Sequence, residues 1–204
     1  PVEKDYTLVV VTDSAVNASN KVSNTVLVLV IDADGKIVAA RFDCAEVTPS
    51  LVDGAIADVD SVITKVEKGD GYTGMAAGSW ADQAKAFEDY LIGKTAAEVA
   101  AIETKEVNNH QIAVDEALLS AGCTIQITDY IEAVVAACAD EQGMAFKAVP
   151  GSFTLGVAAT TSAADSTSAT ADADGLVAMY SDFAATVIAD GKIVAALNDA
   201  IQPK

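Results

Sequence analysis

The sequence predicts an α+β fold built mainly on antiparallel sheet. The stretch DGKIVAA at Asp34–Ala40 returns letter for letter at Asp190–Ala196. Apolar, β-branched runs flank both copies, and a stretch with helical periodicity separates them. Related strand units commonly pair into sheet whose open face is covered by helices. We therefore expect two repeated strand units, about 6–42 and 153–197, with a helical insert, about 79–140, packed on them.

The first unit is predicted to contain three strands. Tyr6–Thr12 is rich in β-branched residues, and a polar loop is expected at Asp13–Asn24 before a second strand at Thr25–Ile31. Asp34-Gly35 predicts a hairpin turn into a third strand at Lys36–Phe42, because glycine tolerates the positive φ that such turns require. The second strand is apolar on both of its alternating faces. This pattern is typical of a central strand that is covered on both sides.

The second unit is predicted to repeat this order. Its strands are expected at Phe153–Thr160, Leu176–Ile188 and Lys192–Leu197, with the longer loop between the first two placed at Ser162–Asp174, where Ser, Thr, Ala and Asp dominate. For residues 46–68 the pattern does not distinguish strand from helix.

Three helices are expected in the insert. Ser79 begins a capping box, apolar residues follow on one helical face, and Gly93 ends that helix. A second capping box opens a short helix from Thr95 to about Ile102, and a third helix runs from Thr128 to about Asp140. The stretch Asn108–Val114 is ambiguous. The buried stripe of the third helix is predicted to be Ile131, Val134, Val135 and Cys138.

The size of the chain fits one compact domain. It has 204 residues, of which 51% are hydrophobic, so an ordered core is expected. We expect residues 1–204 to form a single domain, and the alternative is two halves, 1–149 and 150–204, joined near Pro150-Gly151. The longest apolar runs, such as Val26–Ile31, are far shorter than the roughly 20 residues of a membrane-spanning helix.

Charge and residue counts exclude several kinds of site. Lys and Arg number 12 against 30 Asp and Glu, a net charge of −18 that repels phosphate backbones, so no nucleic-acid partner is expected. Without a CxxC, HExxH or Cys/His cluster, no metal site is expected. The three cysteines are either one disulfide and one thiol or, as we favour, three buried thiols. A Ser-His-Asp hydrolase would need His110, the single imidazole, which we interpret as a surface residue, so no catalytic residue is assigned.

The segment Asp115–Thr128 resembles a flavin-attachment motif. Its Ala121-Gly122-Cys123-Thr124 lies where the FMN-binding domain family has Ser-Gly-Ala-Thr ahead of a helix, so the glycine and threonine match and the other two positions depart. The resemblance implies that Thr124 carries FMN through a phosphoester bond installed by a flavin transferase. It also makes Gly122 and Thr124 the candidate cofactor-binding residues, since glycine lets the backbone approach a phosphate closely.

Other segments extend the resemblance. Val28–Arg41, with DGKI at its centre, and Glu46–Pro49 look like further parts of the FMN-binding family. The chain is also similar to uncharacterised surface lipoproteins of Gram-positive anaerobes with tandem DGKIV hairpin units, which share the helix start at Gly93–Val99. Against the flavin motif, Ile125 and Ile127 alternate as in a strand.

We therefore expect a secreted or lipid-anchored cell-surface module that binds an unknown protein or small molecule on an FMN-binding-like scaffold, without catalysis or a cofactor. The alternative is an electron-transfer flavoprotein with FMN attached through its phosphate to Thr124, for which a flavin transferase would be a partner. By the same resemblance the protein is extracellular or on the surface of a Gram-positive bacterium. Membrane contact is expected only through a lipid anchor outside this sequence. Because the chain opens with Pro1 and not Met, we expect that a segment upstream has been removed.

Overall fold

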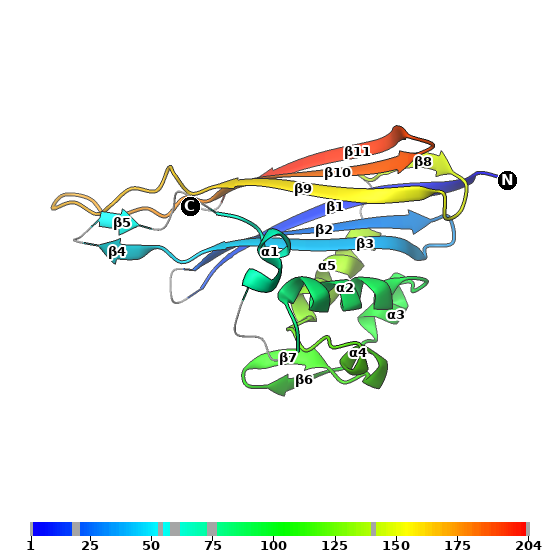
Figure 1. The fold of residues 1–204 in the computed structure, drawn as a ribbon, viewed down its shortest axis with the longest axis horizontal. Coiled ribbons are helices and arrows are strands. Elements are labelled where there is room, and N and C mark those ends of the chain that lie inside the picture. Colours follow the sequence, from blue (N-terminus) through cyan, green and yellow to red (C-terminus); the bar gives the residue numbers. More distant parts are fainter. Residues whose placement is uncertain are drawn as a thin grey trace.

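The computed structural model describes residues 2–17, 21–52, 55–57, 62–72, 77–139 and 142–202. The described part forms three layers: a three-stranded sheet, a four-stranded sheet and a layer of short helices (Figure 1). All strand pairs in both large sheets are antiparallel. The predicted α+β class with mainly antiparallel sheet is confirmed.

The four-stranded sheet contains the first repeated unit. Its strands are β1 (Lys4–Val16), β2 (Val22–Asp32) and β3 (Ile37–Val47), and β8 (Met144–Ala148) pairs with the start of β1. The predicted polar loop at Asp13–Asn24 is wrong, because β1 and β2 stay paired out to Val16 and Val22. The polar side chains in this stretch do not stop the strands from pairing, because the hydrogen bonds between strands are made by backbone groups.

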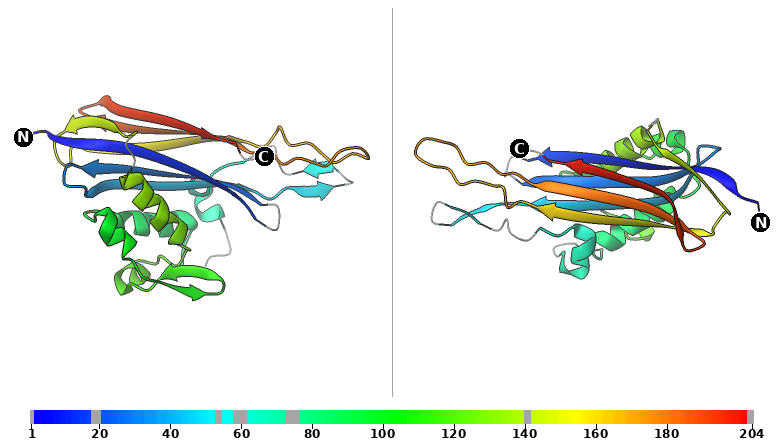
Figure 2. Two further views of the ribbon diagram at one scale, coloured as in Figure 1. Left: turned by 180° about the vertical axis from the view of Figure 1, so that it is seen from behind. Right: turned by 90° about the horizontal axis from the view of Figure 1, so that it is seen from above.

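The three-stranded sheet contains the second unit. Its strands are β9 (Phe153–Ser162), β10 (Tyr180–Ala189) and β11 (Lys192–Ile201). The prediction that β10 begins at Leu176 is wrong. The backbone of Leu176 instead exchanges two hydrogen bonds of 2.8 Å with Thr167, inside a long connection that projects from the body beside β4 and β5 (Figure 2).

Both copies of DGKIVAA form the turn of a β-hairpin. Gly35 and Gly191 have φ of 75° and 71°, which favours glycine. Each hairpin has a register shift just before its turn, between Val30 and Ile31 in the first and between Val187 and Ile188 in the second. The repeat in the sequence is therefore a repeat of hairpin and bulge.

Strand β2 is buried on both faces, as predicted. Val26, Val28 and Val30 point to the second sheet, where they share a hydrophobic cluster with residues of β10. Leu27 and Leu29 point to the helices. The partners from β10 are Phe183, Ala185 and Val187, and those from the helices include Phe87, Leu91 and Val134.

The three predicted helices are present as α2 (Trp80–Leu91), α3 (Ala96–Ala100) and α5 (Thr128–Cys138), and the predicted end of the last, Asp140, lies outside the described residues. Both capping boxes form, at Ser79 and Thr95. The insert also contains a hairpin of β6 (Thr104–Val107) and β7 (His110–Ala113), and a short helix α4 (Glu116–Ser120).

Residues 46–68 contain both strand and helix. After β3 come β4 (Ser50–Val52) and β5 (Ala55–Ala57), then α1 (Lys65–Lys68) and the 3-10 turn η1 (Gly69–Gly71). Thr64 caps α1 through a capping box with Glu67. Among the residues described, no helix has the length and apolar character needed to cross a membrane.

Candidate functional site

A pocket of about 800 Å³ lies between the four-stranded sheet and the insert, and we call it the sheet–insert pocket. It is lined by Val11, Asp13, Ala15, Asn17, Lys21, Ser23, Thr25, Leu27, Cys44, Glu46, Lys65, Tyr72, Trp80, His110, Thr124, Ile125, Gln126, Asp129, Tyr130 and Ala133. Three aromatic rings and a mixture of polar and charged groups therefore meet at one place.

The sheet forms the floor of this pocket. Ser23 of β2 pairs with Glu46 of β3, and Thr25 pairs with Cys44. Paired residues project from the same face of a sheet, so all four side chains point toward the helical layer. On the face of β2 that points to the helices, polar Ser23 and Thr25 therefore precede apolar Leu27 and Leu29, and the polar part of this face lines the pocket.

Glu46 bonds to both lysines that line the pocket. Its carboxylate accepts from Lys65 Nζ at 2.8 Å, from Lys21 Nζ at 3.1 Å and from the Tyr72 hydroxyl at 3.3 Å. The Glu46 and Lys65 side chains are only 13% and 10% exposed. This Glu46 cluster joins β3, α1 and the β1–β2 hairpin, three elements that the sequence separates.

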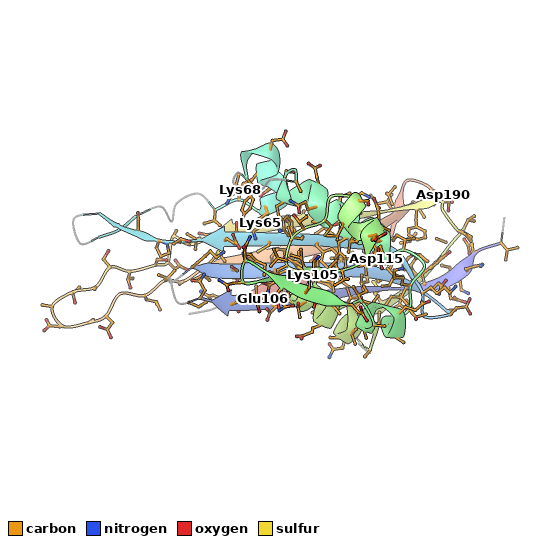
Figure 3. All side chains as sticks on the ribbon, turned by 90° about the horizontal axis from the view of Figure 1, so that it is seen from below. Lys65, Lys68, Lys105, Glu106, Asp115 and Asp190 are labelled. Carbon is orange, nitrogen blue, oxygen red and sulfur yellow. The ribbon has the colours of Figure 1, made fainter. Side chains whose placement is uncertain are left out.

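Lys65 also contacts two aromatic rings. Its Nζ lies 5.1 Å from the centroid of Tyr72 and 5.2 Å from that of Trp80, within the range of a cation–π contact. Figure 3 views the molecule from the helical side and labels Lys65 and Lys68 on α1. It also labels Lys105 on β6, and the strand paired with β6, β7, contains the pocket residue His110. The charge of Lys65 is therefore held both by a carboxylate and by ring faces.

These contacts shift the titration of the cluster. Burial opposes the charged form of Glu46, but Lys65 and Lys21 outweigh it and hold the pKa of Glu46 below its ordinary value. Burial also opposes the charge of Lys65, but its electrostatic interactions with Cys44, Glu46 and Tyr72 and its hydrogen bond to Glu46 outweigh burial and raise the pKa of that ammonium. Burial raises the pKa of the Cys44 thiol, so Cys44 is neutral at pH 7 and Glu46 supplies the countercharge of Lys65.

Thr124, a candidate cofactor-binding residue, is exposed and lines the sheet–insert pocket. Its backbone N–H and its hydroxyl donate to Oε1 of Gln83, at 2.8 and 2.9 Å. The strand suggested by Ile125 and Ile127 is absent, because this segment is a loop between α4 and α5 whose isoleucines are buried. Gly122, the other candidate, begins that loop with φ of 90°, which favours glycine.

Several residues of the pocket carry no sequence signal for a site. Lys65 belongs to residues 46–68, for which the pattern did not distinguish strand from helix, although Thr64 and Glu67 fit a capping box. Tyr72 lies just beyond that range. Gln83 reads as a polar position on an amphipathic helix, and nothing in its neighbours indicates the contact with Thr124. His110 is exposed on β7 at the pocket.

All three cysteines are free thiols, and no disulfide forms between them. The favoured prediction of three buried thiols is right for Cys44 and Cys123 and wrong for Cys138, which is only partly buried. Within the described ranges, no group of three His, Cys, Asp or Glu side chains is placed to hold a metal ion.

Comparisons with protein-family models, with curated proteins and with solved structures find no match for this chain. The resemblance to the FMN-binding family therefore stays a prediction.

Proposed function

We propose that this chain is a secreted or lipid-anchored cell-surface binding module on an FMN-binding-like scaffold, and that the sheet–insert pocket holds its ligand. The observation that carries the proposal is the meeting of Trp80, Tyr72, Tyr130 and Thr124 around one pocket of about 800 Å³. Sites for small organic molecules typically measure about 300–1,000 Å³ and combine aromatic walls with a few polar groups. The alternative ligand for such a module is a protein partner.

The second candidate is a flavoprotein with FMN attached through its phosphate to Thr124. The specific observation in its favour is that the Thr124 side chain is exposed at an aromatic-lined pocket. The size and the rings of the pocket fit a flavin, and Trp80, Tyr72 and Tyr130 would hold its ring system. Bound FMN would supply one- and two-electron transfer.

Gln83 would limit what this chain contributes to such an attachment. It holds the proton of the Thr124 hydroxyl without removing it, because an amide oxygen is not a base at neutral pH. In this alternative the Thr124 oxygen would attack the FMN phosphorus of a flavin dinucleotide held by the flavin transferase. The phosphoanhydride bond of that donor would break, the nucleoside monophosphate would leave, and a base of the transferase would take up the Thr124 proton.

A mass measurement separates the two candidates. The whole-protein mass is determined after co-expression with a flavin transferase, for the wild type and for Thr124→Ala. An FMN adduct that disappears in the variant overturns the cofactor-free proposal. An unchanged wild-type mass removes the flavoprotein alternative.

Fluorescence tests the pocket itself. Trp80 is the single tryptophan of the chain and lines the pocket, so its emission reports on an occupant. Titration with FMN, and separately with the dye 1-anilinonaphthalene-8-sulfonate, is expected to quench Trp80 saturably. Ala133→Phe narrows the pocket and should abolish this quenching, whereas Ala136→Phe, on the exposed side of the same helix, should not. The proposal fails if neither probe quenches the wild type, or if both variants behave alike.

A further inference from the structure

Gln83 is a buried polar residue, with 1% of its surface exposed, and it bonds to Thr124, which lines the sheet–insert pocket. We propose that Gln83 is a positioning residue that fixes Thr124 as a hydrogen-bond acceptor toward the pocket, so that the pocket selects ligands presenting an N–H or O–H donor at that point. The ligand part of this inference rests on the proposed function. The positioning part rests on the contacts of Gln83 alone.

The orientation of the Gln83 amide is decided by backbone groups. The Thr124 N–H can only donate, and it lies 2.8 Å from Oε1. The carbonyl oxygen of Gly78 can only accept, and it lies 3.3 Å from Nε2. An amide side chain has one accepting and one donating end, so these two neighbours assign both ends.

This orientation decides the direction of the Thr124 hydroxyl bond. Because the Gln83 atom at 2.9 Å from Oγ1 is an acceptor, the hydroxyl must donate its only proton to it. The Oγ1 atom of Thr124 can then only accept a further hydrogen bond, through its lone pairs. Since Thr124 is exposed and lines the pocket, an occupant that reaches it gains a hydrogen bond only by donating one.

Replacing Gln83 by an apolar residue of similar length would remove this constraint. The Thr124 hydroxyl would then rotate freely and could donate to an occupant as well as accept. The backbone N–H of Thr124 would lose its partner as well. The pocket would keep its shape but lose its preference for a donor.

The first experiment needs no ligand. Amide hydrogen exchange of Thr124 is measured by NMR in the wild type, Gln83→Met, Gln83→Glu and Gln126→Met. Loss of the side-chain acceptor in Gln83→Met should speed Thr124 exchange about tenfold. In Gln83→Glu, which keeps an accepting oxygen at this position, the Thr124 amide should exchange as slowly as in the wild type. Gln126→Met is the matched control at the same pocket, where the amide bonds to Asp129 and not to Thr124.

The outcomes are decisive for positioning. Unchanged Thr124 exchange in Gln83→Met overturns the proposal, and so does an equal acceleration in Gln126→Met. If Gln83→Met fails to fold, fast Thr124 exchange in the folded Gln83→Glu variant would overturn it instead.

The second experiment tests the ligand part with FMN, whose ring imide and ribityl chain carry N–H and O–H donors. FMN affinity is measured by quenching of Trp80. Thr124→Val should weaken it about tenfold, because the accepting hydroxyl is gone. Gln83→Met should weaken it less, because the freed hydroxyl can still accept, and the double variant should bind no more weakly than Thr124→Val alone. Additive losses, or full affinity in Thr124→Val, overturn the donor selectivity. If FMN does not bind the wild type, the proposed function fails for flavins and the ligand part fails with it, while the exchange data still decide the role of Gln83.

Discussion

Ile37 and Ile193 occupy the same place in the two copies of DGKIVAA, yet Ile37 is 0% exposed and Ile193 is 65% exposed. The insert causes this difference. The carbonyl of Ile37 accepts from Gly93 N–H at 2.7 Å, and the Ile37 N–H donates to Lys94 O at 2.9 Å, so the end of α2 lies directly on this hairpin. The face of the second sheet that corresponds to it has no such cover among the described residues.

The two isoleucines should respond differently to truncation. Ile37→Ala removes a fully buried side chain and should lower the free energy of unfolding by about 2–5 kcal/mol. Ile193→Ala changes an exposed position and should alter it by less than about 0.5 kcal/mol. Chemical denaturation with both variants checks this. Equal effects would contradict the burial difference between the copies.

A buried polar contact between the two sheets gives a second prediction. Asn24 of β2 donates through Nδ2 to Ser181 Oγ of β10 at 2.9 Å, and both residues are 0% exposed. Ser181→Ala should cost about 1–3 kcal/mol, because it leaves the amide with only a long contact of 3.4 Å to Met179 O. The double variant Asn24→Leu/Ser181→Ala should be more stable than Ser181→Ala alone, since neither polar group is then left unpaired. Additive losses in denaturation curves would refute this coupling.

Local signals account for the parts of the fold that were predicted. The hairpin turns follow from Asp-Gly between apolar runs, and the helix starts follow from capping boxes at Ser79 and Thr95. Strand β8 was not predicted, because Met144–Ala148 becomes a strand by pairing with the distant β1. The β6–β7 hairpin did carry a signal, since Asn108 and Asn109 take positive φ at its turn and asparagine tolerates that conformation.

The candidate site was predicted only in part. Gly122 and Thr124 were singled out through a motif contiguous in sequence, and Thr124 does line the sheet–insert pocket. Glu46, Lys65 and Gln83 come from a strand, a short helix and a long helix, and their contacts depend on how the insert packs. A single sequence records each residue but not the distance between them, so this part of the site could not be predicted.

Thiol reactivity gives a third prediction. Cys44 and Cys123 are buried, and Cys138 is partly exposed. Burial raises the pKa of Cys123 to about 11 and also raises that of Cys138, so thiolate is scarce at neutral pH and all three should alkylate slowly. Iodoacetamide should modify Cys138 before Cys123, which is 0% exposed and should react at least about 10³-fold more slowly because it requires opening of the fold. Peptide mass mapping over time checks the order, and labelling of Cys123 as early as Cys138 would contradict it.

The Glu46 cluster gives the last prediction, which concerns stability and pH. Glu46→Gln removes the countercharge of Lys65, whose side chain is 10% exposed, and a buried charge left without its partner typically costs about 3–5 kcal/mol. Lys65→Met should cost less, because Glu46 keeps Lys21 at 3.1 Å and the Tyr72 hydroxyl at 3.3 Å. Denaturation at neutral pH compares the two variants, and a larger loss in Lys65→Met would contradict this ranking.

The pH dependence of the Glu46→Gln effect follows from the direction of each shift. The pKa of Glu46 is lowered from 4.5, so its contribution is fully present above that value and is lost as the pH falls through the lowered pKa. The pKa of Lys65 is raised from 10.5, so its contribution is fully present below that value and is lost as the pH rises through the raised one. The wild type should therefore exceed Glu46→Gln in stability by a constant amount across neutral pH, and this difference should shrink in acid. The pKa values of buried Asp43 and Glu88 are raised, so their effect on the free energy of unfolding changes with pH in the opposite direction to that of Glu46. Both residues are present in the wild type and in Glu46→Gln, so their effect cancels when the two stabilities are subtracted. A difference that stays constant down to acid pH would mean that Glu46 does not hold its charge against Lys65.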